Sequence, residues 1–360
     1  MTAIDELRIA IVGSFIVALI LSLAITPISM VLAKKTNFLD IPKDDRRMHK
    51  KAVPTMGGLA IICAFVIVSL LVKNFILDKF EWAINGSVGS EKIFAVIIGG
   101  AIIFLIGIID DKIDLNPWVK LLGQIICASI VYFMGVRIME IGLFGWTFSG
   151  SVGAEIAGYF VTVLWLVAIT NTINLIDGLD GLAAGVATIA SLSIAYVGYI
   201  QGMYALTFYM VVLAGSSAGF LPFNFFPAKV FMGDCGAMFL GFTFATVSIL
   251  DNTKSATLMA VIVPVLVLGV PVFDVFFAVV RRTANGKSIF SADKGHLHHQ
   301  LTRIGLGQRR TVLMLYGISG VMGIAAVSYS RMHFLESIAL ILIALLFILV
   351  LIWGWSKREN

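Results

Sequence analysis

The sequence has few charged residues, few cysteines and no long polar stretch. Only 13% of its 360 residues are Asp, Glu, Lys or Arg, against roughly 25% in soluble domains. With 59% hydrophobic residues and a mean hydropathy of +0.99, the chain cannot form the polar shell of a water-soluble domain. Three cysteines without a CxxC pair exclude a disulfide framework. Because no segment is polar enough for a separate soluble unit, we expect one membrane domain over residues 1–360.

Long apolar runs predict an all-α, polytopic membrane protein. The first run, Ile9 to Ala33, exceeds the about 7–15 residues of a signal-peptide core, so it predicts a transmembrane helix. Pro264, Gly269 and Pro271 predict a kink or break in the ninth span. Since a spanning helix needs about 20 apolar residues, we expect about eleven spans, near residues 9–33, 56–73, 92–109, 118–135, 156–173, 182–200, 204–221, 235–250, 256–280, 312–330 and 334–353.

Basic residues are distributed unequally between the two sides of these spans. Nineteen of the 26 Lys and Arg residues fall in the odd-numbered connections and the C-terminal tail. Cytoplasmic loops carry the excess of Lys and Arg, so we expect the N-terminus outside and the C-terminus in the cytoplasm. The net charge of +5 is therefore interpreted as membrane topology, and no nucleic-acid partner is expected.

Four groups of polar residues, far apart in sequence, all fall on the expected cytoplasmic side. Ionisable residues at a membrane boundary cost free energy unless they are paired, hydrated or used in function. The pattern therefore predicts one shared site. The groups are Asp110 with Asp111; Asn174, Asp177 and Asp180; Asp234; and His296, His298 and His299.

Each acidic group suits metal or phosphate chemistry. Asp110 and Asp111 are adjacent carboxylates that repel unless a cation intervenes, and such a pair can hold Mg²⁺-linked phosphates or offer a base. A solvated helix end is the alternative. Asn174, Asp177 and Asp180 have the i, i+3, i+6 spacing of one helical face. Glycines follow both aspartates of that stripe.

The eighth span opens with an acid between glycines, in Gly233-Asp234-Cys-Gly236. This acid is a further metal-ligand candidate, and helix N-capping is the alternative. The loop 281–311 carries the three histidines and seven basic residues, and its spacing is not a standard zinc set. Histidines among cations can receive a phosphate or diphosphate. Acids for a divalent metal beside cations for phosphates predict phosphoryl transfer.

Five segments carry a resemblance to a known family. In order along residues 35–310 they are DIPKDDRRMHKKAVPTMGG, GIIDDK, NTINLIDGLDGLAAG, NFFPAKVFMGDCGAMFLG and DKGHLHHQL. They resemble the polyprenyl-phosphate N-acetylhexosamine-1-phosphate transferase family (glycosyltransferase family 4). The resemblance implies transfer of a sugar-1-phosphate from a UDP-sugar to undecaprenyl phosphate at the cytoplasmic membrane face. It also implies release of UMP, a Mg²⁺ cofactor that Mn²⁺ can replace, and the homodimers common in the family.

The same resemblance implies roles for individual residues. Asp110 and Asp111 match the catalytic acid pair, with Asp110 deprotonating or positioning the lipid phosphate, and Asp234 and Asp177 match metal-binding acids. Phe231 matches an aromatic residue that stacks on uracil. The remaining matches are Lys50, Thr55, Asn174, Asp177 and Asp180 near the nucleotide and sugar, and Lys120, His296, His298 and His299 near the phosphates.

Two branches of the family are expected as alternatives. One uses UDP-GlcNAc or a related amino sugar to begin a cell-envelope polysaccharide, and the other transfers phospho-MurNAc-pentapeptide for peptidoglycan. The His-Leu-His-His pattern, the first loop and an eleventh span with a Lys-Arg tail favour the first. The resemblance leaves both direct attack by the lipid phosphate and a two-step route through an aspartyl intermediate open.

Two other classes of membrane protein share some of these features. Asp110-Asp111-Lys-Ile-Asp114 also reads as the DDxxD motif of intramembrane prenyltransferases, but that leaves Asp234 and the histidines unexplained. A transporter would also have kinked helices and membrane-face acids. The charged residues cluster at one face, however, and the chain shows no corresponding halves. Dependence on both a UDP-sugar and a lipid phosphate separates the three.

Overall fold

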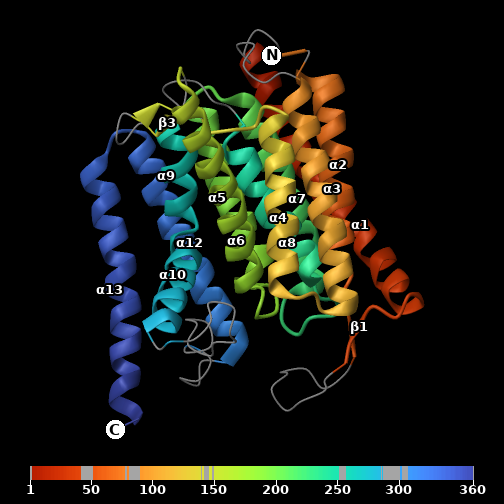
Figure 1. The fold of residues 1–360 in the computed structure, drawn as a ribbon, viewed down its shortest axis with the longest axis vertical. Helices are drawn as coiled ribbons and strands as arrows, with labels where there is room; N and C mark the ends of the chain where they lie inside the picture. Colours follow the sequence, from red (N-terminus) through yellow and green to blue (C-terminus); the bar gives the residue numbers. More distant parts are fainter. Residues whose placement is uncertain are drawn as a thin grey trace.

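The computed structural model describes residues 2–41, 52–77, 79–80, 90–138, 140–141, 146–147, 150–250, 257–284, 286, 301 and 307–359. These residues form a bundle of long helices whose two termini lie at opposite ends (Figure 1). The first part of the bundle contains α1 (Ala3–Lys35), α2 (Gly58–Leu71) with a π-helical extension (Val72–Leu77), α3 (Ser90–Ile113), α4 (Pro117–Phe133), α5 (Val152–Ile176) and α6 (Leu182–Ile200). The second part contains α7 (Tyr204–Asn224), α8 (Gly233–Ser248), α9 (Thr257–Val267), α10 (Gly269–Ala284), α12 (Gly307–Ser330) and α13 (Phe334–Glu359).

In the described part of the chain, the strands form short antiparallel hairpins. One pairs β1 (Leu39–Asp40) with β2 (Val53–Pro54), and the other pairs β3 (Glu140–Ile141) with β4 (Trp146–Thr147). They cap the bundle ends and leave the helices as the bulk of the structure. The expected all-α class is confirmed.

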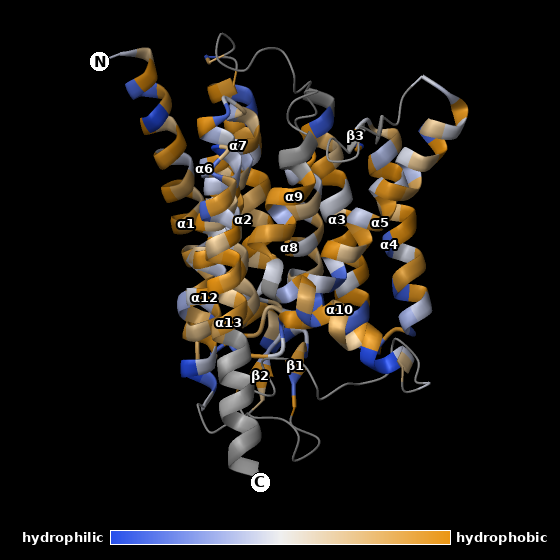
Figure 2. Ribbon diagram, turned by 90° about the vertical axis from the view of Figure 1, so that its left-hand side faces the viewer, coloured by the Kyte–Doolittle hydropathy of each residue, from blue (hydrophilic) through white to orange (hydrophobic). Residues whose placement is uncertain are grey.

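The helices have the length and composition of membrane spans. Seven are long and apolar enough to cross a bilayer, or eight if the broken pair α9–α10 is one span. The helices α4 and α8 and the apolar part of α13 occupy the other expected positions but are shorter. The predicted break is present, since the α9 and α10 axes differ by 83°. Apolar residues cover the middle of the bundle, while hydrophilic ones gather toward its ends (Figure 2).

Helix α8 lies at the centre of the bundle, and glycines allow its neighbours to approach it. Every residue from Cys235 to Ser248 is buried, and α8 packs against α2, α3 and α5. A Cβ at Gly107 of α3 would collide with the backbone of Cys235, and one at Gly58 of α2 would collide with Gly236. Close approach of backbones therefore brings the end of α3 beside the first turn of α8.

The expectation that Asn174, Asp177 and Asp180 share one helical face is wrong. Helix α5 ends at Ile176, and Asp177 is its C-terminal capping residue. Asp180 lies in the turn before Gly181, which has a φ of 81° and is the N-cap residue of α6. A left-handed conformation is natural for glycine, so the Asp-Gly pattern ends one helix and starts the next. The three side chains are distributed over a helix end and a turn.

Candidate active site

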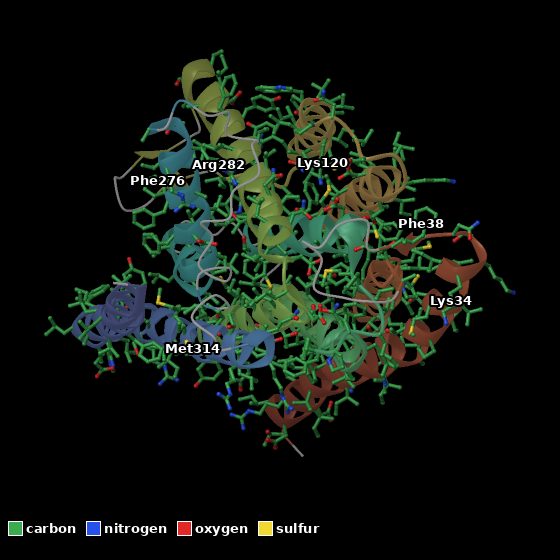
Figure 3. All side chains as sticks on the ribbon, turned by 90° about the horizontal axis from the view of Figure 1, so that it is seen from below. Lys34, Phe38, Lys120, Phe276, Arg282 and Met314 are labelled. Carbon is green, nitrogen blue, oxygen red and sulfur yellow. The ribbon has the colours of Figure 1, made fainter. Side chains whose placement is uncertain are left out.

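The predicted polar residues meet at one end of the bundle. This end contains the C-terminal ends of α3 and α5 and the N-terminal ends of α4, α6 and α8. Figure 3 views the molecule from this side and labels Lys120, near the start of α4. The site is therefore assembled from helix ends.

Lys120 joins two of the predicted acids. Its Nζ lies 2.5 Å from Oδ2 of Asp110 and 3.4 Å from Oδ2 of Asp234. The side chains of Asp110 and Lys120 are 5% and 15% exposed, whereas that of Asp234 is 38% exposed. The solvated-helix-end alternative therefore does not apply to Asp110. A buried cation stands between an enclosed carboxylate and one that an entering ligand can reach.

Asp110 is fixed by the turn that connects α3 to α4. Its Oδ1 accepts a hydrogen bond from the backbone N–H of Leu115 at 2.9 Å, and its Oδ2 accepts one from Lys120. Asn116 then caps α4 by accepting from the N–H of Trp118, and Pro117 occupies the first helical position. Both carboxylate oxygens of Asp110 are thus engaged in holding the start of α4 and its lysine.

Asp111 caps the N-terminus of α8 from another helix. Its Oδ1 accepts from the N–H of Asp234 at 2.7 Å, and its Oδ2 accepts from that of Cys235 at 3.2 Å. A helix N-terminus has unpaired N–H groups and a partial positive charge, both of which an acid satisfies. The capping residue of α8 is therefore Asp111, and the side chain of Asp234 is left for Lys120.

Asn174 and Asp177 complete the wall beside Asp234. Asn174 lies beside the Asp234 carboxylate, and its Oδ1 is buried without a partner among the described residues. Burial raises the pKa of Asp177 well above its usual value, and the charges of Asp234, Asp111 and Asp180 raise it further. A buried carboxylate close to other acids and an unpaired amide oxygen favour a cation at this wall.

The turn after α5 is tied down by residues from three other segments. Asp180 Oδ2 accepts from the N–H of Ala228 at 2.9 Å. Asn224 accepts from the N–H of Gly181 at 3.1 Å and donates to the carbonyl of Val230 at 3.0 Å. The Tyr316 hydroxyl of α12 donates to the carbonyl of Gly181 at 2.5 Å. Asp180 is thus held as an anchor of the turn.

Thr55 and Phe231 lie on adjacent extended segments next to the site. The N–H of Phe231 donates to the carbonyl of Pro54 at 2.8 Å, and that of Gly57 donates to the carbonyl of Phe231 at 3.0 Å. Thr55 continues the pairing through its N–H to Phe38, at 3.1 Å. These bonds place both predicted nucleotide residues on one border of the site, and both side chains are partly exposed.

Four predicted residues cannot be placed beside these. Lys50, His296, His298 and His299 lie outside the described residues. Their predicted roles near the nucleotide and the phosphates stay predictions.

The described site offers oxygen donors but no closed metal cage. Among the residues the structure describes, no three His, Cys, Asp or Glu side chains meet closely enough to hold an ion unaided. Mg²⁺ typically takes one or two carboxylates and completes its octahedron with water and substrate phosphates. Asp234, Asp177 and the unpaired Oδ1 of Asn174 are the donors suited to that arrangement.

Sequence reasoning missed several polar residues that support the site. Gln124 and Asn171 pair across the α4–α5 contact, while Asn224 and Tyr316 hold the turn after α5. All four lie within apolar helices, where a polar side chain is costly and is retained for a partner. Gln124 follows Lys120 by four residues and Asn171 precedes Asn174 by three, a helical spacing that could have marked both.

Comparison with known proteins links this arrangement to one family. Residues 93–252 match the sequence model described as glycosyl transferase family 4. The chain is 38% identical over 348 residues to a probable undecaprenyl-phosphate N-acetylglucosaminyl 1-phosphate transferase of Bacillus subtilis, covering 97% of this chain and 93% of that protein. It is 36% identical over 346 residues to a decaprenyl-phosphate N-acetylglucosaminephosphotransferase of Mycobacterium leprae, covering 89% and 83%. It is 33% identical over 325 residues to a phospho-N-acetylmuramoyl-pentapeptide-transferase of a Geobacillus species, covering 86% and 93%.

Proposed function

The chain belongs to glycosyl transferase family 4, and we propose that it transfers N-acetylglucosamine-1-phosphate from a UDP-sugar to undecaprenyl phosphate, releasing UMP. Two relatives with 38% and 36% identity carry names of polyprenyl-phosphate N-acetylglucosamine phosphotransferases. The relative named as a phospho-N-acetylmuramoyl-pentapeptide-transferase is less similar, at 33%. The main proposal therefore rests on the N-acetylglucosamine branch, with the muramoyl-pentapeptide branch as its alternative.

The observation that carries the proposal is the bridge of Lys120 between Asp110 and Asp234. In phosphoryl transfer the protein contributes mainly positioning and electrostatic stabilisation of the transferred group. A buried ammonium next to a reachable carboxylate supplies a fixed positive charge for phosphate oxygens. Such a preorganised charge stabilises the transition state without reorganisation during the reaction.

Each described residue then has a part in the proposed reaction. Lys120 offsets negative charge on the diphosphate. Asp110 holds Lys120 in place by accepting a hydrogen bond from its ammonium group. Asp111 fixes the first turn of α8 and thereby the direction of Asp234. A phosphate monoester has a second pKa of about 6, so at neutral pH the lipid phosphate needs little help to lose its proton. The two accepted hydrogen bonds of Asp110 support a positioning role.

Mg²⁺ fits the donors at the wall of the site. Asp234, Asp177 and Asn174 would hold it together with substrate phosphates. When bound, the ion neutralises charge on the diphosphate and orients the leaving UMP. The raised pKa of Asp177 supports this assignment, because a nearby divalent cation would restore the ionised carboxylate.

The proposed site faces the cytoplasm, where nucleotide sugars are available. Its support is the excess of Lys and Arg on this side of the spans. In this orientation the eleven spans expected from the sequence place the N-terminus outside, and the enzyme resides in the bacterial inner membrane. The partly exposed side chains of Phe231 and Thr55 border the proposed nucleotide position. A homodimer is proposed only by analogy with the family.

The deciding experiment is UMP release by purified protein with undecaprenyl phosphate and Mg²⁺. UDP-GlcNAc is compared with UDP-MurNAc-pentapeptide, each with and without the lipid. Lipid-dependent release with UDP-GlcNAc is the expected result. Release only with the pentapeptide substrate would move the protein to the other branch, and no release with either would overturn the proposal.

A further inference from the structure

The amide side chains of buried Gln124 and partly buried Asn171 connect α4 to α5 next to the proposed site. Asn171 Nδ2 donates to Gln124 Oε1 at 2.5 Å, and Gln124 Nε2 donates back to Asn171 Oδ1 at 3.3 Å. Asn171 Nδ2 also donates to the carbonyl of Val167 at 2.8 Å. Gln124 is 1% exposed. The pair is therefore a closed, reciprocal contact between side chains of two different spans.

The position of the pair relates it to the site. Gln124 lies one helical turn after Lys120 on α4, and Asn171 lies three residues before Asn174 on α5. Residues three or four apart share a helical face. The amide pair thus lies one turn below both Lys120 and Asn174, deeper in the bundle than the carboxylates.

Further hydrogen bonds on the α4–α5 contact lie at a greater distance from the site. Ser129 and Tyr159 share a bond of 2.8 Å between their hydroxyls. Tyr132 donates to the carbonyl of Glu155 at 3.2 Å. Compared with these bonds, the amide pair lies nearest to Lys120 along α4.

The pair specifies one register of α4 against α5. A buried amide that loses its partner costs about 1–3 kcal/mol, so a slide that breaks both bonds is unfavourable. Helix α5 is itself fixed against α8, because Gly241 of α8 lies against the backbone of Thr170. The register of α4 is thereby transmitted to α8, which carries Asp234.

We propose that the Gln124–Asn171 pair is a positioning element that holds Lys120 between Asp110 and Asp234. The inference rests on the proposed phosphotransferase function and deepens it. Without the pair, α4 keeps its apolar contacts but its start is free to shift. Lys120 then loses its fixed distances to the two carboxylates, and the phosphates meet a displaced charge.

The test compares Gln124→Met with the wild-type enzyme in the UMP-release assay. A displacement of about 1 Å at a catalytic group can cost about 100-fold in rate, so we expect kcat to fall by about 10- to 100-fold. The KM for UDP-GlcNAc should change by less than about twofold, because the lost interaction belongs to the transition state. The melting temperature in detergent is measured alongside.

A double-mutant cycle separates positioning from general packing. If Gln124 acts through Lys120, adding Gln124→Met to Lys120→Met should not lower kcat further. If the two residues act independently, the fold losses in kcat of the two single variants should multiply in the double variant. Ser129→Ala is the matched control. It removes a hydrogen bond of the same α4–α5 contact and should leave kcat unchanged. The exchanged variant Gln124→Asn with Asn171→Gln should recover part of the lost rate.

The outcomes distinguish the two proposals. An active wild-type enzyme with an unaffected Gln124→Met variant, or with multiplying effects in the cycle, overturns the positioning role alone. Equal losses of kcat for Ser129→Ala and Gln124→Met also overturn it, since any hydrogen bond between α4 and α5 would then have the same effect on the rate. A wild-type protein without UMP release overturns the proposed function and this inference with it.

Discussion

The two ends of the bundle use charged residues in different ways. At the site end, Lys120 and Asp110 are enclosed, with side chains 15% and 5% exposed. At the opposite end, Lys79 and Glu6 form an ion pair of 3.0 Å whose side chains are 62% and 36% exposed. Both pairs have N–O distances within hydrogen-bonding range, at 2.5 and 3.0 Å, but their side chains differ in their exposure to water.

This difference shows what the enclosed pair is for. An exposed pair is screened by water and contributes little, about 0–1 kcal/mol. An enclosed pair loses hydration that its mutual attraction often only balances, so it is weak evidence for stability. Lys120 and Asp110 are therefore better explained by the chemistry of the site than by the stability of the fold. The predictions below test this contrast from its largest expected effect to its smallest.

Asp234→Asn should abolish most turnover. The substitution keeps the shape of the side chain and removes the charge that faces Lys120 and the proposed Mg²⁺. Since a metal supplies several kcal/mol of transition-state stabilisation, we expect kcat to fall by about 1000-fold or more. UMP release measured over a Mg²⁺ titration checks this, with Cys63→Ala in α2 as an active control. Near wild-type turnover would refute the metal assignment of Asp234.

Lys120→Met should lower kcat by about 100- to 1000-fold, the usual effect of losing one preorganised charge or donor. The substitution nearly keeps the length of the side chain but leaves the enclosed Asp110 carboxylate without its cation, so the detergent melting temperature should also fall and the rate is compared per folded molecule. A melting temperature that collapses while the residual rate per folded molecule is retained would mean that this end, like the opposite one, uses its charges for structure.

Sequence patterns could predict the spans and the gathering of acids because both depend on local composition. The apolar runs required helices, and their parity placed Asp110, Asp177 and Asp234 on one side. The structure brings all three to the same end of the bundle. Side-chain partners could not be predicted in this way. Asp111 caps a helix that begins 122 residues later, and nothing local to GIIDDK indicates it.

The turn after α5 illustrates the same limit. An i, i+3, i+6 spacing predicts one helical face only if the helix continues, and here it ends at Ile176. The glycines after Asp177 and Asp180 were the available signal for that end. The contacts of Asp180 and Gly181 with Ala228 and Tyr316 come from distant segments, so they required the fold.

Tyr316→Phe should have a moderate effect. It removes the hydrogen bond to the carbonyl of Gly181, worth about 1 kcal/mol, so we expect kcat/KM to fall by about fivefold. Tyr209→Phe is the matched control, because the Tyr209 hydroxyl is buried without a partner among the described residues. Its removal should leave activity unchanged and should maintain or raise the melting temperature. Equal effects of the two substitutions would contradict the anchoring role of Tyr316.

Glu6→Gln should have the smallest effect, and it tests the other side of the comparison. The substitution removes the charge that pairs with Lys79, so the free energy of unfolding should fall by at most about 1 kcal/mol. The rate of UMP release should stay within about twofold of wild type at low and at high salt, because the pair lies at the end of the bundle opposite Lys120. Thermal melting and steady-state kinetics at two salt concentrations measure both quantities. A large loss of rate with an intact fold would show that the end of the bundle opposite Lys120 is energetically coupled to the site. The claim that only the charges at the site end serve the reaction would then be wrong.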